Sequence, residues 1–306
     1  MFKTQINKYL RIKNQICATF IYFAANQSVV LKKSTILFAS FVLVWLSACQ
    51  DTIIIQNKPS STTDAPPVTG YLKKNALIED YTGTWCGNCT RVAWAIEGAK
   101  AQSDKLVSVA IHNGNDPYNY DGIAPLKNLI LPNSPLALPV SRLNRLTVWT
   151  FPETSNIQQV LDLTSFNTTI GLALDTQIVN NQMQVQVKLR CLEAYSDLYL
   201  VVYVLENHLL YNQRNYNSDL YGGQNPIVNF EHNHVLRATL TDIVGNPIAG
   251  TTFNSTQTFN FNEAVPTNIA DASHISFVAF VTNKAHQVLN VREAGANEQQ
   301  NFQINP

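Results

Sequence analysis

The sequence predicts an α/β domain followed by an all-β domain. An apolar strand, Asn75–Tyr81, runs into a Cys86-Gly87-Asn88-Cys89 motif that opens a predicted helix. A second strand, Leu106–His112, follows this helix, and the order strand, helix, strand is typical of a parallel βαβ unit. From residue 168 onward, short alternating or β-branched runs separated by polar turns are typical of a β-sandwich, here expected to be immunoglobulin-like.

The predicted organisation has four parts. Residues 1–48 form a signal sequence, residues 49–69 a lipid anchor and linker, residues 70–167 the α/β domain, and residues 168–306 the β-sandwich domain. The helix after the cysteine motif is expected over Cys86–Ser103, because Val92, Ala95 and Ala99 recur at three- and four-residue spacing. A loop, a third strand and a closing helix follow at Asn113–Tyr120, Leu138–Leu146 and Ser155–Leu163.

In the second domain the sequence pattern predicts strands and no helices. The predicted strands are Ile170–Val179, Gln182–Leu192, Leu198–Glu206, His234–Thr241, Thr256–Asn262 and Ile275–Lys284. Cys191 shares one face of its strand with Val185, Val187 and Leu189, so we expect a buried and chemically inert thiol.

The Cys86–Cys89 pair carries the clearest chemical signal. A cysteine at a helix N-terminus faces unpaired N–H groups and the positive end of the helix dipole, which favour the thiolate. We therefore expect an exposed, nucleophilic Cys86 and a resolving Cys89 less than one helical turn away. Two other interpretations stay open. The pair could be half of a zinc site, for which Cys191 and scattered histidines offer few further ligands, or it could be a purely structural disulfide.

The segment around this pair resembles thioredoxin-like proteins. Members of that family carry Trp directly before the first Cys, matched by Trp85, and often a buried Asp six residues before it, matched by Asp80. The resemblance implies that Asp80 exchanges a proton with the thiol of Cys89. It also implies a cis-proline facing the disulfide, for which Pro139 is the best match, with Leu138 offering its backbone to a substrate peptide.

The match to thioredoxin has one departure. Asn88 stands where thioredoxin has Pro, which affects the expected redox potential rather than the fold. Pro135 is a rival for the cis-proline position, but no strand adjoins it.

The N-terminal region reads as a bacterial export signal. Lys32-Lys33 precede an apolar run from Ile36 to Leu46, which is too short for a comfortable transmembrane helix. Leu46-Ser47-Ala48-Cys49 resembles the lipobox of bacterial lipoproteins, which implies acylation of Cys49 and a membrane anchor. The region before Lys32 is long for such a signal and suggests a translation start near Val30 or Leu31, leaving residues 1–30 untranslated. An extended Pro-, Ser- and Thr-rich linker follows the anchor.

The insertion Asn207–Asn233 is rich in aromatic and amide side chains. Tyr211, Tyr216 and Tyr221 lie among Asn, Gln and Gly residues, a composition that suits either glycans and extended peptides or a loop packed on the sandwich edge. His232 and His234 could ligate a metal together, but no third ligand is evident, so no metal site is predicted. His112 is predicted to lie at the end of a strand. It could stabilise the thiolate of the cysteine motif or be a polar residue at the edge of a loop without a chemical role.

Composition excludes some classes of function. The formal net charge is zero, whereas a nucleic-acid-binding surface normally needs a basic excess, so no nucleic-acid partner is expected. No Gly-rich phosphate loop is present, and no cofactor is predicted.

Three segments together resemble a family of 28-kilodalton outer-membrane-protein-related lipoproteins. They are Glu79–Cys89, Leu143–Arg145 and His232–Arg237. The resemblance implies a lipoprotein at the outer membrane or cell surface of a Gram-negative bacterium, with a thioredoxin-like and an immunoglobulin-like domain. Two functions fit. The first is a lipid-anchored thiol–disulfide oxidoreductase acting on protein thiols or disulfides. The second is a surface binding or adhesion protein for a glycan or host protein, with a structural Cys86–Cys89 disulfide.

Overall fold

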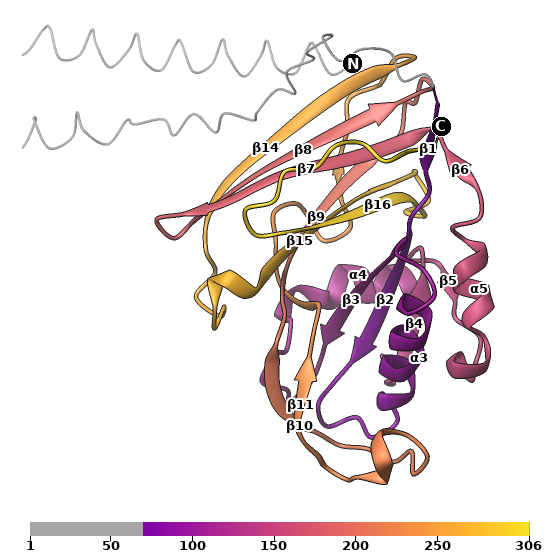
Figure 1. The fold of residues 1–306 in the computed structure, drawn as a ribbon, viewed down its shortest axis with the longest axis vertical. Coiled ribbons are helices and arrows are strands. Elements are labelled where there is room, and N and C mark those ends of the chain that lie inside the picture. Colours follow the sequence, from indigo (N-terminus) through magenta and orange to yellow (C-terminus); the bar gives the residue numbers. More distant parts are fainter. Residues whose placement is uncertain (1–69, 306) are drawn as a thin grey trace, which may run out of the picture. The chain divides into compact units, whose positions relative to one another are not determined.

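The computed structural model describes residues 70–305 of the chain. The predicted signal sequence, the lipidation of Cys49 and the linker lie outside these residues. The described residues fall within one compact unit, and they are mostly β-sheet with few helices (Figure 1). None of the helices in residues 70–305 combines the length and the apolar character that crossing a bilayer requires.

A nine-stranded sheet forms the centre of the fold. Its strands follow the order β16-β15-β9-β12-β3-β2-β4-β5, and β13 pairs with β9 beside this path. In chain order these strands are β2 (Ala76–Thr82), β3 (Leu106–His112), β4 (Val140–Leu143), β5 (Thr147–Val148), β9 (Tyr199–Glu206), β12 (Val235–Thr239), β13 (Asn246–Pro247), β15 (Ile275–Thr282) and β16 (Val288–Gly295).

This sheet contains strands from both halves of the chain. The strand β12 pairs in parallel with β3, where Val235 lies opposite Ala110, and antiparallel with β9. The predicted boundary between residues 167 and 168 therefore marks a change from mixed helices and strands to strands, but it does not separate two sheets. Pairing between residues more than 100 positions apart leaves no local pattern from which the sequence could predict it.

The first half contains the expected βαβ unit. The strands β2 and β3 are parallel, with Ala76 opposite Leu106 and Thr82 opposite His112, and α3 (Thr90–Lys100) connects them. The helix begins later than predicted because Cys86–Cys89 occupy turns before it. The third strand is also shorter than predicted, since positive φ angles at Asn144 and Arg145 end it.

The remaining short elements of this half frame the unit. They are η1 (Asp121–Ile123), α4 (Ala124–Ile130), η2 (Glu153–Ser155), α5 (Ile157–Asp162) and β6 (Asn167–Thr168). The helix α4 is not anticipated by the sequence pattern, whereas α5 corresponds to the predicted closing helix. The strand β6 joins β1 (Tyr71–Lys73) and β17 (Ile304–Asn305) in a small sheet near the two ends of the described chain.

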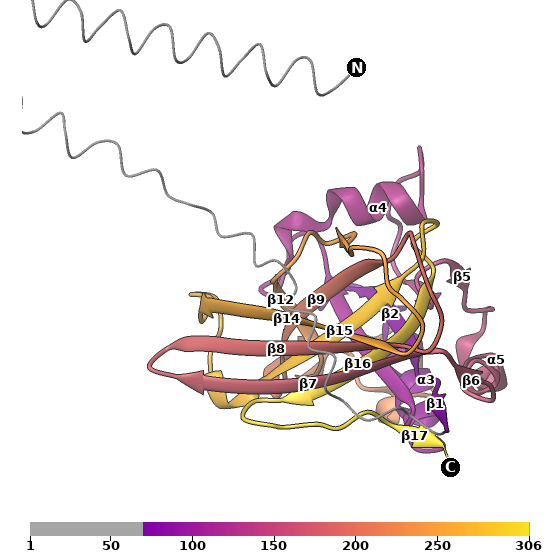
Figure 2. The same cartoon turned by 90° about the horizontal axis from the view of Figure 1, so that it is seen from above.

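Both faces of the large sheet are covered. Neighbouring residues of β2 point to opposite faces, so that Leu77 packs with α4 in one core and Ile78 packs with α3 and α5 in another. A three-stranded sheet of β7 (Ile170–Val179), β8 (Gln182–Cys191) and β14 (Ser255–Ala264) packs on β9 and β15 in a third core. Figure 2 shows this sheet and α4 at separate places around the large sheet.

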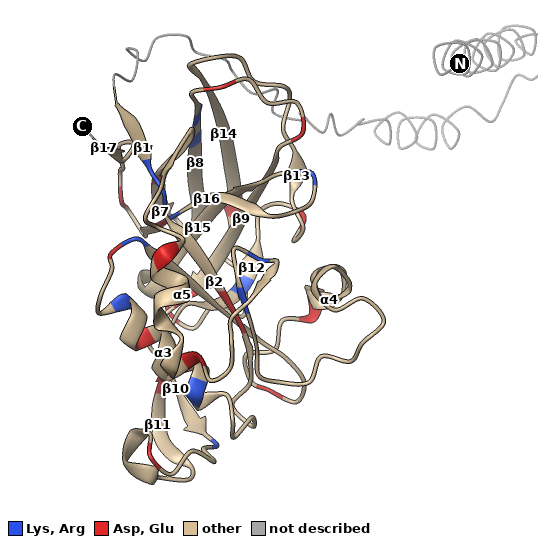
Figure 3. Ribbon diagram, turned by 90° about the vertical axis from the view of Figure 1, so that its right-hand side faces the viewer, with Lys and Arg blue, Asp and Glu red and all other residues tan. Residues whose placement is uncertain are grey.

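The predicted insertion is a β-hairpin, which we call the arm and define as residues 207–233. It contains β10 (Leu209–Gln213), β11 (Ile227–His232) and, between them, the short turn η3 (Tyr221–Gly223). In Figure 1 the arm runs along the edge of the βαβ unit, and its tip turns toward α3. Figure 3 shows acidic and basic residues dispersed along the described ribbon.

Candidate functional site

The central feature is a disulfide between Cys86 and Cys89, at the junction of β2 and α3. The two Cα atoms are 5.4 Å apart. Backbone hydrogen bonds from Cys86 N to Gly83 O and from Cys89 N to Cys86 O, 3.0 and 3.2 Å long, shape the turn. The cysteines are only 5% and 2% exposed, so the expectation of an exposed Cys86 is wrong for this oxidised form.

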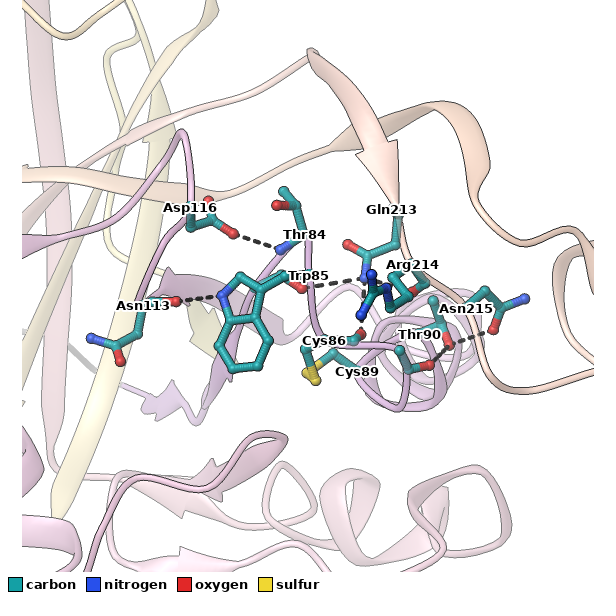
Figure 4. Close-up of a disulfide and its surroundings, with 12 residues drawn as sticks. Thr84, Trp85, Cys86, Cys89, Thr90, Asn113, Asp116, Gln213, Arg214 and Asn215 are labelled. Carbon is teal, nitrogen blue, oxygen red and sulfur yellow. Dashed lines mark hydrogen bonds between the residues drawn. A yellow bond between two sulfur atoms is a disulfide. The ribbon is translucent and has the colours of Figure 1, made fainter.

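The arm packs directly on this turn, and that contact contributes to the burial of Cys86. Arg214 N donates to Thr84 O and Tyr216 N donates to Gly87 O, each at 2.8 Å. The Gln213 side-chain amide donates to Cys86 O at 3.0 Å (Figure 4). The sequence analysis missed these residues, because no local signal connects positions about 130 residues apart.

Tyr216 also explains the glycine inside the motif. A Cβ atom added to Gly87 would lie 2.5 Å from the Tyr216 ring, which is closer than carbon atoms can approach. The need for glycine therefore comes from a contact with the arm as well as from the tight turn that the sequence suggested.

Two asparagines of the arm hold the first residue of α3. The hydroxyl of Thr90 donates to Asn215 Oδ1 at 2.8 Å and accepts from Asn217 Nδ2 at 2.6 Å. Nearby, Tyr221 donates its hydroxyl hydrogen to Glu97 Oε1 on the same helix. The arm therefore contacts both the turn that holds the disulfide and the first two turns of the helix.

Asp80 lies on β2 and is 4% exposed. One of its carboxyl oxygens, Oδ1, has no hydrogen-bond partner among the described residues. Burial and, next, the nearby Glu153 raise the pKa of Asp80 and Arg91 lowers it, and together they bring it to about 8. Asp80 is therefore mostly protonated at neutral pH, and it lines the same cavity as Cys89.

Glu153 and Arg91 form an ion pair beside this carboxyl group. Arg91 Nε lies 2.6 Å from Glu153 Oε2, and Ser141 Oγ lies 3.4 Å from the other oxygen of Glu153. The pair joins α3 to η2. Sequence reasoning did not single out either residue, because two charged residues 62 positions apart carry no pairing signal.

The Leu138–Pro139 peptide bond is cis and stands directly before β4. Val140 pairs with Tyr81 in the antiparallel register of β4 and β2. Pro139 therefore lies at the level of Thr82, at the end of β2 that leads into the disulfide turn. Asp80, Cys86, Cys89 and Pro139 therefore all lie toward this end of the sheet.

Trp85 is 44% exposed beside the disulfide. Its indole N–H donates to Asn113 O at 2.9 Å, which fixes the ring against the loop after β3. The same loop is held by Asp116, which accepts from Thr84 N at 2.6 Å and lies 3.1 Å from His112 Nδ1. Burial acts to raise the pKa of Asp116, but these hydrogen bonds and the charge of His112 lower it to about 2. His112 thus positions the loop that supports Trp85.

Two of the three segments that resemble the lipoprotein family, Glu79–Cys89 and Leu143–Arg145, meet in the buried core. Arg145 places its Nη2 atom 3.2 Å from Glu79 Oε1 and 2.6 Å from the hydroxyl of Tyr203. Glu79 and Arg145 are completely buried. In the third segment, Arg237 Nε lies 3.1 Å from Glu206 Oε2. These contacts give the charged residues of the three segments a structural role, because they join β2 to β9 and β12 to β9.

Comparison with known proteins identifies the family. Residues 136–300, more than half of the chain, match the family described as Outer membrane protein Omp28. The chain belongs to the Omp28 family. The predicted location at the outer membrane of a Gram-negative bacterium agrees with this membership. The matched residues of this Omp28 protein include Pro139 and the arm but not Cys86 or Cys89, so membership by itself says nothing about the disulfide.

Solved structures give further likenesses. HBP35 of Porphyromonas gingivalis is 16% identical, with a TM-score of 0.60, over 78% of this chain and 81% of that one. At this identity the likeness shows a shared fold alone. A domain of the outer membrane lipoprotein Omp28 from Porphyromonas gingivalis is 20% identical over 44% of this chain and 92% of that one, but its TM-score of 0.27 carries no argument. No curated protein matches this Omp28 member.

Proposed function

We propose that this protein is an extracytoplasmic thiol–disulfide oxidoreductase that acts on protein thiols or disulfides and is anchored to the membrane through acylated Cys49. The observation that carries the proposal is Asp80, a buried carboxyl group that lacks a partner at Oδ1 and lines a cavity with Cys89. A disulfide that only stabilises the fold does not require a buried carboxyl group beside it. Burying it also has a cost in stability.

We propose further that residues 70–167 are thioredoxin-like and residues 168–306 immunoglobulin-like. The first assignment is supported by the order β2, α3, β3, β4 and by the cis-proline before β4. The second is supported by two packed sheets in the second half, β14-β8-β7 and the strands around β9 and β15.

In the reducing direction, the thiolate of Cys86 attacks a substrate disulfide and forms a mixed disulfide, and one substrate thiolate leaves. The fraction of Asp80 that is ionised accepts the proton of Cys89, whose thiolate then attacks Cys86 Sγ. This step releases the second substrate thiolate and forms the Cys86–Cys89 disulfide. Oxidation of a substrate follows the same steps in reverse. Trp85, Leu138 and Pro139 border the substrate groove.

The proposal is tested by thiol exchange with the Cys86→Ser variant, measured as insulin reduction and as oxidation of a dithiol peptide. We expect complete loss of both activities. The matched control is Cys191→Ser, which removes a buried thiol remote in sequence from the motif and should retain both. Undiminished exchange by Cys86→Ser would contradict the proposal.

A second candidate, a surface binding or adhesion protein, is favoured by the exposed rings of Tyr211 and Tyr216 on the arm. It predicts binding of a glycan or host protein that is lost when both tyrosines are replaced and that survives Cys86→Ser. Measuring exchange and binding on the same variants separates the two functions.

A further inference from the structure

A cavity of about 430 Å³ lies between α3, the adjoining face of β2 and β3, and the end of β11. Its volume is in the range of small-molecule sites. The residues that line it include Asp80, Cys89, Ala93, Ile96, Phe230 and His232. Neither Trp85 nor Pro139 is among them, so the cavity is distinct from the proposed substrate groove.

One side of α3 packs in the core on the sheet, and another side lines the cavity. Val92, Ala95 and Ala99 pack on Ile78 and Leu106 in a common core. Ser108, Ala110 and His112 of β3, three alternate residues that face the same way, line the cavity. They span roughly 13 Å at about 3.3 Å per residue. Residues of the arm, from Phe230 to Asn233, line another side of this space, so the cavity is a partly enclosed chamber.

The middle of the chamber is apolar. Ala93 and Ile96 of α3, Ala110 of β3 and the ring of Phe230 line it. Such a lining suits the hydrocarbon part of an organic molecule, because burying apolar surface on both partners is favourable.

The charged groups around the chamber already have partners. Lys100 Nζ lies 2.8 Å from His234 Nε2, and the other ring nitrogen of His234 lies 3.2 Å from Glu293 Oε1. Glu97 accepts a hydrogen bond from Tyr221. A charged ligand would therefore enter without an unpaired counter-ion to meet it, and burying an unpaired charge is costly.

Two neutral groups in the chamber lack partners among the described residues. They are Asp80 Oδ1 and His232 Nε2, in residues that are 4% and 6% exposed. The ring of His232 also hydrogen-bonds to the Tyr211 backbone, and burial together with the neighbouring His112 lowers its pKa to about 4. A neutral imidazole that donates through one nitrogen accepts through the other, so Nε2 is an unused acceptor. Buried groups of this kind normally have a partner.

We propose that this chamber binds a small, uncharged organic molecule that carries a hydroxyl group on an apolar body, of about the size of one aromatic ring. The hydroxyl group donates a hydrogen bond to His232 Nε2, and the ring lies among Ala93, Ile96 and Phe230. The chamber shares Asp80 and Cys89 with the proposed exchange site, but binding of this molecule does not require the disulfide to react.

The test uses three probes of the same shape and different charge, namely benzyl alcohol, benzoate and benzylamine. Binding to the purified full-length protein is followed at pH 7 by ligand-observed NMR and by the shift in melting temperature. We expect saturable binding of benzyl alcohol, at least about tenfold tighter than that of either charged probe. No saturable binding of benzyl alcohol, which would mean that water alone fills the chamber, overturns the proposal. Equal binding of all three probes overturns it as well.

Two variants test whether benzyl alcohol binds in the chamber. Ala93→Leu fills its apolar part, and His232→Leu removes the acceptor. Each should weaken the binding of benzyl alcohol at least about tenfold, and Ala93→Leu keeps the test valid if His232→Leu folds poorly. The matched control is His274→Leu, which replaces a partly exposed histidine just before β15 that does not line the chamber and should bind as the wild type does. Unchanged binding by Ala93→Leu would contradict the assignment. These readouts are independent of exchange activity, so either proposal can fail without the other.

Discussion

Replacement of Asp80 by Asn should change how the stability of the protein depends on pH. In the folded, oxidised protein burial raises the pKa of this carboxyl group to about 8. In the unfolded chain its pKa returns to about 3.9. Between these two values the folded state retains a proton that the unfolded state has released, so the free energy of unfolding falls as pH rises toward 8.

The size of the effect follows from the gap of about four pH units between the two values. Each unit corresponds to about 1.4 kcal/mol, which gives an upper limit of about 6 kcal/mol over the whole range and about 4 kcal/mol between pH 5 and pH 8. The side-chain amide in Asp80→Asn does not ionise, so the variant should lose this part of the pH dependence.

The assay is guanidinium-induced unfolding of the oxidised protein at pH 5 and pH 8. We expect Asp80→Asn to gain stability relative to wild type on going from the lower to the higher pH. Asp104→Asn, which replaces an exposed carboxylate in the same half of the chain, is the control and should follow the wild type. Parallel pH dependence in Asp80→Asn and wild type would refute the account of Asp80 as a buried, protonated acid.

Three further predictions concern the surroundings of the site. Arg145→Met should lower the free energy of unfolding by about 3–5 kcal/mol, because it leaves Glu79 charged and buried without a positively charged partner, and a loss below about 1 kcal/mol in urea unfolding would contradict this. Gln213→Ala should speed reduction of the disulfide by dithiothreitol several-fold, since it removes hydrogen bonds that hold the arm on the turn, whereas Leu210→Ala on the exposed arm should not. Cys191 should resist iodoacetamide in the folded protein at pH 8, because burial raises the pKa of its thiol to about 11, and rapid alkylation there would show that the residue is accessible.

The local part of the site could be predicted from the sequence. The strand before Cys86 and the helix that follows the cysteine motif could be predicted from apolar spacing and short-range turn geometry, whereas the buried position of Asp80 was implied by the resemblance to thioredoxin-like proteins. Pro139 was identified because it matches the cis-proline that thioredoxin-like proteins carry directly before a strand of the sheet. In this protein that strand is β4, which pairs with β2. Each of these signals spans fewer than about 15 residues, the range over which pattern and propensity are informative.

The long-range part could not be predicted. The arm appeared only as an aromatic insertion, although it packs on the disulfide turn through Gln213 and Tyr216. The pairing of β12 with β3 joins the two predicted domains in one sheet, and it depends on a contact about 125 residues apart in sequence. The helix α4 was missed because it has only seven residues, begins beside a proline and lies in a turn-rich segment. Such features depend on tertiary packing rather than on local preference.

The reduction potential of the Cys86–Cys89 pair tests the central claim most directly. It can be measured by equilibrating the purified protein with glutathione buffers and quantifying the dithiol fraction. Our account predicts a value between about −120 and −270 mV, the range of working thiol–disulfide catalysts. A value below about −300 mV would mark a structural disulfide and would contradict the proposed oxidoreductase function.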